Sequence, residues 1–278
     1  SKKDIIMGFS VNTNVGAMAA LQSLNATNKG LSTVQSRINT GMKVASTKDD
    51  SAAFTVAQTL RGDLGGLSAV NSSLSRAKST VDVATAGAEQ VSDLVNQMKA
   101  KAVEASDAGL DADSRTALGK DFDALKEQIN TIIDSSEFNG TNLLKASGGS
   151  VSALQSTDTA AATLNVANQD LTAVVTAIGS TFTDAATAKT MVGTLDTQAK
   201  AINGKLSTLG AAGRKIDGQQ TFISKLSDVI DSGIGNLVDA DLAKESAKLQ
   251  ALQVKQQLGV QALSIANQAP QTITSLFR

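Results

Sequence analysis

The chain lacks Cys, His, Trp and Tyr altogether, and its 278 residues include a single Pro. Without Cys it can form no disulfide, thiol nucleophile or thiolate metal site, and without His it lacks the commonest general base and metal ligand. Ser-His-Asp catalysis and His-ligated zinc are therefore excluded. Aromatic residues make up 3% of the chain, and all of them are Phe. With few rings and almost no Pro, we expect long helices that pack through Ala, Val, Leu and Ile.

Charge of one sign and long hydrophobic runs are also missing. The formal net charge of −1 provides no general basic field for nucleic acid or anionic membrane. No run of about 18 apolar residues predicts a transmembrane helix. The start of the chain, where Ile5, Ile6 and Met7 are the only apolar stretch, does not resemble a cleavable signal peptide. We therefore expect no nucleic-acid or membrane partner, and either a cytoplasmic location or export by a route that reads no signal peptide.

A spacing of seven residues dominates the middle of the chain. One apolar ladder and its companion row, three residues later, predict a coiled-coil helix over about 52–106. A second ladder predicts a helix over about 186–231, and a shorter stripe predicts one over 112–134, capped by Asp111 or Asp113. Helices of such lengths suit an antiparallel bundle. The first ladder is Leu60, Leu67, Leu74, Val81, Ala88, Val95 and Ala102, its companion row is Asp63, Val70, Ala77, Ala84, Val91, Met98 and Ala105, the second ladder is Leu195, Ile202, Leu209, Ile216, Ile223, Ile230 and Leu237, and the stripe is Leu118, Phe122, Leu125, Ile129 and Ile132.

The two ends of the chain are nearly uncharged. Only Lys29 and Arg37 carry charge between Gly8 and Thr40, and no residue does between Gln256 and Phe277. A solvated helix usually has a charged outer face, so an uncharged polar one suits a helix that packs against other protein chains. The alternative is a pair of weakly ordered tails, and a chain can be disordered as a monomer and helical once assembled. The candidate residues of this interface with other protein are Leu21, Leu24, Leu31, Val34, Ile38, Leu249, Leu252, Leu258, Leu263 and Ile265.

Two breaks and one turn punctuate the pattern. Gly41–Ser51 and Ser232–Asn236 are predicted to interrupt the helices. Phe138-Asn139-Gly140 predicts a type I′ turn, because Asn-Gly tolerates positive φ. The Ser- and Thr-rich stretch after it is expected to form a short hairpin-containing excursion.

These signals predict a mainly α fold, an elongated antiparallel coiled-coil or helical bundle with paired terminal helices and a small excursion that contains a β-hairpin. We divide the chain into paired terminal helices (1–44 with 236–278), a helical bundle (45–140 with 184–235) and a short, variable, surface-exposed segment (141–183).

Few residues suggest chemistry. Asp49-Asp50 is the one tight carboxylate pair within a break, and paired carboxylates can serve acid-base catalysis or hold a hard cation. Asp50 or Ser51 is also a good N-cap for the following helix, which favours a structural role. The glycines at 62, 65 and 66 lack a Walker lysine and a preceding strand. We predict no catalytic residue, no metal site and no cofactor, and therefore no enzyme.

Several separated motifs resemble bacterial flagellin. The front carries NTN at 12–14 and LNATNKGLSTVQSRINTGMKVASTKDDSAAF at 24–54. FNGTNLL follows at 138–144, and the back carries LGAAGRKI at 209–216, DADLAKESAKLQALQ at 239–253 and ANQAPQ at 266–271. The resemblance spans about 1–145 and 190–278, and the short middle implies that a large outer domain is missing.

The resemblance implies a function. Flagellins pair their terminal helices into the core of the flagellar filament, surround it with the bundle, and turn the central segment outward. Unfolded chains are exported through a type III apparatus and fold at the distal end of the filament. The resemblance therefore implies a secreted, self-polymerising motility protein of the extracellular flagellum. Its implied partners are copies of itself, an export chaperone at the C-terminal region, and the filament cap and hook-junction proteins.

Two other functions remain open from the residues. A hook–filament junction protein shares such termini but would act in few copies. A flagellin-like surface protein that binds, for example, polysaccharide would need a groove, and the sequence identifies none.

Overall fold

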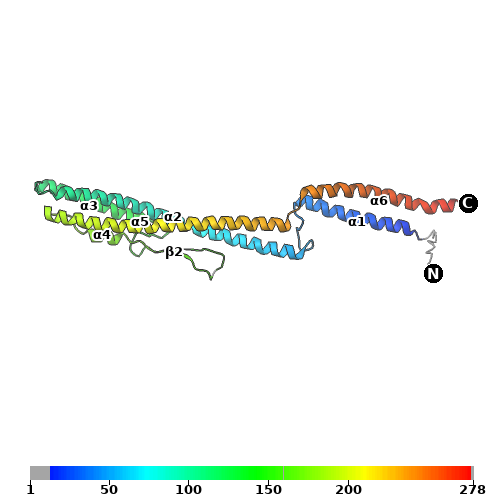
Figure 1. The fold of residues 1–278 in the computed structure, drawn as a ribbon, viewed down its shortest axis with the longest axis horizontal. Helices are drawn as coiled ribbons and strands as arrows, with labels where there is room; N and C mark the ends of the chain where they lie inside the picture. Colours follow the sequence, from blue (N-terminus) through cyan, green and yellow to red (C-terminus); the bar gives the residue numbers. More distant parts are fainter. Residues whose placement is uncertain (1–12, 159, 277–278) are drawn as a thin grey trace. The chain divides into compact units, whose positions relative to one another are not determined.

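The computed structural model describes residues 13–158 and 160–276; expectations about Ser1–Asn12 and Phe277–Arg278 lie outside them. The chain divides into two compact units, 1–61 with 230–278 (unit 1) and 62–229 (unit 2). The predicted mainly α fold is confirmed (Figure 1). The elements are α1 (Val15–Thr40), α2 (Ser51–Ala105), α3 (Ala112–Ser135), β1 (Val151–Ala153), β2 (Leu164–Val166), α4 (Thr172–Ile178), α5 (Ala185–Val238) and α6 (Leu242–Leu276).

The heptad ladders form the core of unit 2. On α2 both rows are buried from Leu67 to Ala105, whereas Leu60 is half-buried and Asp63 is exposed. On α5 the row from Leu195 to Ile223 is buried. The two helices run antiparallel, as shown by the ion pairs that join them. Lys78 Nζ lies 3.0 Å from Asp217, and Lys99 pairs with Asp196.

Helix α3 begins where its cap was predicted. The Asp111 carboxylate accepts hydrogen bonds from the Ser114 backbone N–H (2.8 Å) and hydroxyl (2.7 Å). These bonds stabilise the charged form and lower the pKa of Asp111. Phe122 is buried edge-on against Phe182 with ring centroids 5.3 Å apart.

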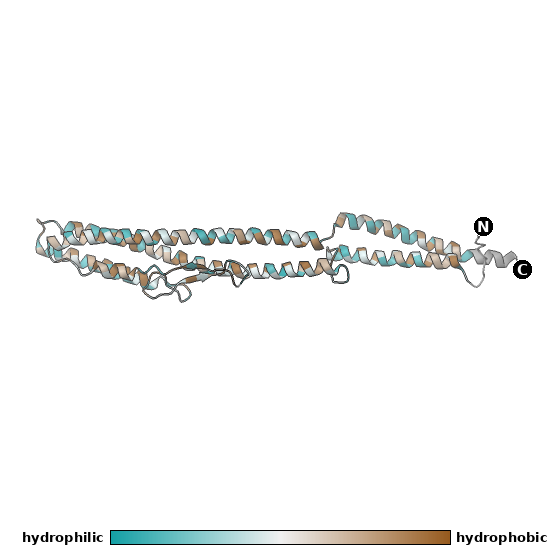
Figure 2. Cartoon of the chain, turned by 60° about the horizontal axis from the view of Figure 1, so that its bottom comes forward, coloured by the Kyte–Doolittle hydropathy of each residue, from teal (hydrophilic) through white to brown (hydrophobic). Residues whose placement is uncertain are grey.

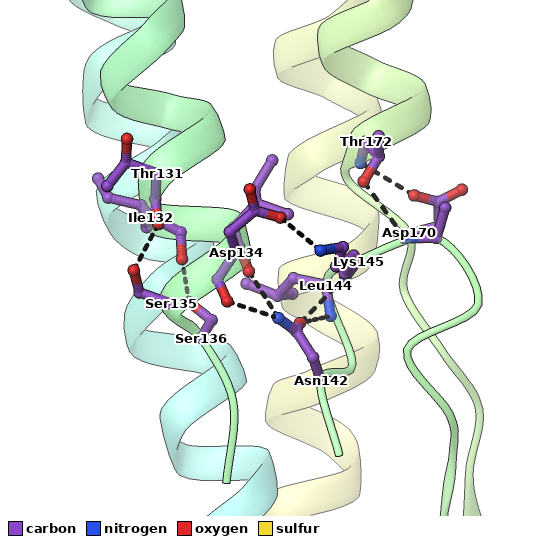
Figure 3. A network of polar contacts seen from close by, with 12 residues as sticks. Thr131, Ile132, Asp134, Ser135, Ser136, Asn142, Leu144, Lys145, Asp170 and Thr172 are labelled. Atoms are coloured by element: carbon purple, nitrogen blue, oxygen red, sulfur yellow. Dashed lines mark hydrogen bonds and ion pairs between the residues drawn. The ribbon is translucent and has the colours of Figure 1, made fainter. Parts of the chain in front are cut away.

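The segment 141–183 is held against the rest of unit 2 by hydrogen bonds and by buried apolar side chains. The type I′ turn is confirmed, since Asn139 and Gly140 have φ of 51° and 80°. After it, buried Asn142 donates to the Ile133 carbonyl (2.7 Å) and accepts from the Leu144 backbone N–H (2.9 Å) (Figure 3). β1 and β2 then form an antiparallel pair with Val151 opposite Val166. Helix α4, which the sequence pattern did not predict, buries Val174, Val175 and Ile178.

The predicted break at Ser232–Asn236 is wrong. Helix α5 continues through both Gly233 and Gly235 and ends at Val238. Each glycine costs the helix up to about 1 kcal/mol relative to Ala. Ile234 and Val238 are buried on the same stretch, and their burial offsets that cost.

The true break, after Val238, pairs with the predicted front break, which is confirmed. The Lys43 and Val44 backbone N–H groups donate to the Val238 carbonyl at 2.8 and 3.2 Å. The Ala240 N–H donates to the carbonyl of Gly41, whose φ of 70° ends α1 in the left-handed conformation. The two chain reversals of unit 1 are thus tied by backbone hydrogen bonds.

Candidate assembly interface

Helices α1 and α6 pair lengthwise within unit 1 (Figure 1). Thr27, Leu31 and Val34 of α1 are buried along this pair. On α6 the matching row is half-buried and keeps heptad spacing, so the pair is a coiled-coil seam. That row is Glu245, Leu249, Leu252, Gln256, Gly259, Leu263 and Ala266, in which Glu245 is the fully buried member.

Two glycines let the helices approach closely. A Cβ at Gly259 would lie 3.2 Å from Leu24 Cδ1, and one at Gly30 would lie 3.6 Å from Leu252 Cδ1. Each leucine thus packs over a glycine of the opposite helix. This contact assigns Leu24 and Leu252 to the seam inside one chain.

Uncharged polar residues add direct bonds across the pair. Gln256 Nε2 donates to Asn28 Oδ1 at 2.7 Å, and Asn14 Nδ2 donates to the Ala266 carbonyl at 2.7 Å. These amide bonds fix the register of α1 against α6 at two levels. Figure 2 shows hydrophobic and hydrophilic residues interspersed along both helices.

A partly satisfied ion cluster lies near the breaks. The Glu245 side chain is only 7% exposed; its Oε1 lies 2.9 Å from Lys248 Nζ and 3.7 Å from Arg37 Nη1. Glu245 Oε2 and Arg37 Nε are buried without a hydrogen-bond partner in the described part of the chain. The nearby Asp49 carboxylate accepts from the Ala45 and Ser46 N–H groups.

Asp49 and Asp50 have structural roles. The pKa of Asp49 is lowered mainly by the hydrogen bonds from Ser46, and the charge of Arg37 makes a smaller contribution in the same direction. Asp50 Oδ1 accepts from the Ala53 N–H at 3.0 Å and so caps α2. The described residues contain no group of three carboxylates that could hold a metal ion.

The structure separates the predicted interface residues into two classes. Leu24, Leu31, Val34, Leu249, Leu252 and Leu263 are buried or half-buried, and Ile38 is half-buried near the end of α1. Leu21, Leu258 and Ile265 are instead exposed, and the last two have 59% and 69% of their surface in solvent. Periodicity identified apolar positions without distinguishing these classes.

Sequence reasoning missed other exposed apolar side chains on the same helices. On α6 a second heptad row contains Val254 beside Leu258 and Ile265, and this signal was present in the sequence. Among the side chains that the structure describes, those missed are Val15, Met18, Leu242, Val254 and Val260.

Comparison with known proteins identifies this arrangement. Residues 11–149 match the family model of the bacterial flagellin N-terminal helical region, and residues 192–277 match that of the C-terminal helical region. The chain belongs to the bacterial flagellin family. Among curated flagellins, FljK of Caulobacter vibrioides is 49% identical over 97% of this chain and 98% of its own length. A flagellin of Brucella melitensis is 35% identical over 97% of this chain and 99% of its own length.

Solved structures agree on the fold. The crystal structure of Bacillus cereus flagellin matches with a TM-score of 0.50 and 25% identity, over 53% of this chain and 86% of that one. A putative flagellar hook-associated protein from Vibrio parahaemolyticus matches with a TM-score of 0.56 at 13% identity, over 69% of this chain and 100% of that one. At that identity the second likeness concerns the fold alone.

Family membership gives the chain its role. It is a flagellin without a large outer domain, a structural protein and a subunit of the flagellar filament. The junction-protein and surface-binding alternatives are not favoured. Within the described residues no helix is both apolar and long enough to span a bilayer.

Proposed function

We propose that this flagellin polymerises through the outward faces of α1 and α6, with no catalytic role and no cofactor. The observation that carries the proposal is the second apolar row of α6. At 3.6 residues per turn, Val254, Leu258 and Ile265 point away from the side of α6 that meets α1. This row contains no charged residue and is exposed in the single chain. We call it the outer α6 face.

The energetics favour covering this face. Fully burying one Leu or Ile side chain contributes about 1.5–3 kcal/mol. An exposed apolar row along a helix marks a site of protein association. In a subunit that assembles with copies of itself, the natural cover is the terminal helices of neighbouring copies.

The ten predicted interface residues then act in two steps. The seam residues, such as Leu31 and Leu252, pair α1 with α6 inside each subunit. Leu21, Leu258 and Ile265 form contacts between subunits. Both sets of residues are needed, because the seam residues order the helix pair and the outward residues then bind neighbouring copies.

The domain division is part of the proposal. We assign 1–44 with 236–278 to the filament core, 45–140 with 184–235 to the surrounding bundle, and 141–183 to the outer surface. The backbone hydrogen bonds between the two breaks, at Gly41–Val44 and Val238–Ala240, support a boundary near these residues. The two compact units divide instead at 61/62 and 229/230, so that 45–61 and 230–235 belong to unit 1.

We further infer that the protein acts outside the cell. Its export chaperone would bind the C-terminal region, where the exposed apolar row of α6 would otherwise associate early. The filament cap and the hook-junction protein would contact the same terminal helices at the two ends of the filament.

The test compares inward and outward substitutions on α6. Leu258→Asp and Ile265→Asp are each expected to raise the critical concentration for seeded polymerisation more than about tenfold, because a charge would be buried between copies. Hydrogen exchange of the α1–α6 amides in the monomer should stay unchanged. Leu263→Asp, on the seam, should reduce both polymerisation and exchange protection.

Ser246→Asp, an exposed position on the flank of α6, is the matched control and should polymerise like the parent chain. Normal filaments from Leu258→Asp and Ile265→Asp would refute the outer α6 face as a contact between subunits.

A further inference from the structure

Among the described residues of unit 2, three apolar side chains of α5 form a patch that remains largely exposed. On α5 the side chains of Phe222 and Val229 are 56% and 68% exposed, and Leu226 between them is half-buried. The spacings of four and three residues place them on one side of the helix, away from the buried Ile216 and Ile223. We call these three residues the α5 patch. An exposed Phe with apolar neighbours is typical of an interaction site.

Unit 2 also carries a groove between α2 and α3, with a volume of about 410 Å³. It is lined by the apolar Ala100, Ala124 and Leu125 together with the polar or charged Gln97, Lys101, Asp121 and Gln128. Leu125 belongs to the apolar stripe of α3, yet it is half-buried because it faces this groove. We call it the α2–α3 groove. Small side chains on both walls leave room for a large apolar side chain from outside.

The patch cannot fill the groove of its own chain. Lys99, beside Ala100, pairs with Asp196, and Lys78 pairs with Asp217, just before the patch. The rise of 1.5 Å per residue therefore separates patch and groove by about 40–50 Å along the helices. Any α5 patch that enters such a groove must come from another molecule.

We propose that the α5 patch of one subunit packs into the α2–α3 groove of the next subunit. The proposal rests on the proposed self-polymerisation and adds a second contact, in the bundle, to that of the terminal helices. A knob and a groove at different levels of one unit form a head-to-tail contact, and such a contact generates open-ended helical filaments. A self-complementary patch would instead close into a dimer.

The charges around the two surfaces agree with this partner. Lys225 lies within the α5 patch, and no ion pair of the described residues includes it. Asp121 and Lys101 both line the groove and pair with each other; Asp121 Oδ2 lies 3.0 Å from Lys101 Nζ, and the Asp121 side chain is well exposed. Packing the patch into the groove would bring Lys225 to this pair, as a second cation beside the Asp121 carboxylate. A second copy therefore offers Phe222 as an apolar anchor and Lys225 as a further partner for Asp121.

The absence of Cys makes a cross-linking test clean. The variant Phe222→Cys with Ala124→Cys is polymerised and treated with a short bismaleimide. We expect a ladder of covalent dimers, trimers and higher oligomers from filaments, and none from monomers. Ser224→Cys with Ala124→Cys is the matched control; Ser224 is exposed on another face of α5 and should give no ladder.

Phe222→Ala supplies a measurement without cross-linker. It should raise the critical concentration for polymerisation about tenfold, as expected for an aromatic anchor, while Ser224→Ala leaves it unchanged. Filaments with no ladder at position 222, a ladder of equal strength from the Ser224 control, or an unchanged critical concentration for Phe222→Ala would each overturn this contact alone. Failure of the parent chain to polymerise would overturn the proposed function and this contact together.

Discussion

At the scale of single residues, two helical glycines, Gly87 and Gly204, differ in what surrounds them and therefore in their effect on stability. Gly87 of α2 lies under the turn that leads to Asn142, where a Cβ would collide with Ser136 Oγ and lie 2.9 Å from Leu144 Cδ1. Gly204 of α5 has nothing within 4 Å of its Cβ position. The first glycine permits a close approach, and the second only weakens its helix.

Replacing each glycine by Ala should therefore change the stability in opposite directions. Gly87→Ala should destabilise the monomer by about 1–3 kcal/mol, because the added methyl group overpacks a buried contact. Gly204→Ala should stabilise it by up to about 1 kcal/mol through helix propensity. Urea unfolding followed by circular dichroism measures both. A stabilising Gly87→Ala would contradict the packing of the 136–144 segment against α2.

Asp111 predicts a pH effect at the start of α3. Its pKa lies below the ordinary value of 3.8, because backbone and hydroxyl groups of Ser114 donate to the carboxylate. A group whose pKa is lower in the folded state stabilises that state above its unfolded pKa, and the stabilisation is lost as the pH falls through the lowered value. Protection of the Ser114 amide against hydrogen exchange should thus decrease below about pH 4.

Asp111→Ala should lose this protection at neutral pH as well. Asp123→Ala, an exposed carboxylate further along α3, is the control and should behave like the parent chain. Equal protection in both variants would show that Asp111 does not cap the helix in solution.

At the scale of helices, the sequence predicted most of what lies inside one chain. The α2 rows from Leu67 to Ala105 are buried as expected, because heptad spacing of apolar residues leaves a helix only one favourable way to pack. The start of α3 followed from Asp111 for a similarly local reason. Where a rule depended on propensity alone, as at Gly233, tertiary burial outweighed it and the helix continued.

The candidate interface was predicted less completely, for a physical reason. An apolar row shows that a face is covered, but not whether the cover comes from the same chain. Leu24 meets Gly259 within the subunit, whereas Ile265 on the same pair faces outward. Helix α4 was missed because seven residues provide too little periodicity to recognise.

The Arg37–Glu245 pair yields a prediction for the α1–α6 pair. Arg37→Met or Glu245→Leu alone should reduce hydrogen-exchange protection around both positions. The first leaves buried Glu245 with Lys248 as its one remaining cation, and the second leaves Arg37 without Glu245. The double variant should restore most of the protection, since an apolar pair avoids the desolvation of both ions. Protection that falls additively in the double variant would show that the two side chains are not coupled.

At the scale of the whole molecule, the single chain leaves apolar surface exposed on α6 and on α5. The outer α6 face is apolar and nearly chargeless, and the α5 patch and the α2–α3 groove lie too far apart to meet within one chain. Under our two proposals these features have a common explanation, in which each is completed by a neighbouring copy.

The most direct test of the central claim is a high-resolution electron cryomicroscopy map of the assembled filament. The account predicts that Leu258 and Ile265 are each buried against the terminal helices of another copy, while Leu24 and Leu252 remain packed within their own α1–α6 pair. A map in which Leu258 and Ile265 face bulk water, with no sister chain in contact, would contradict it.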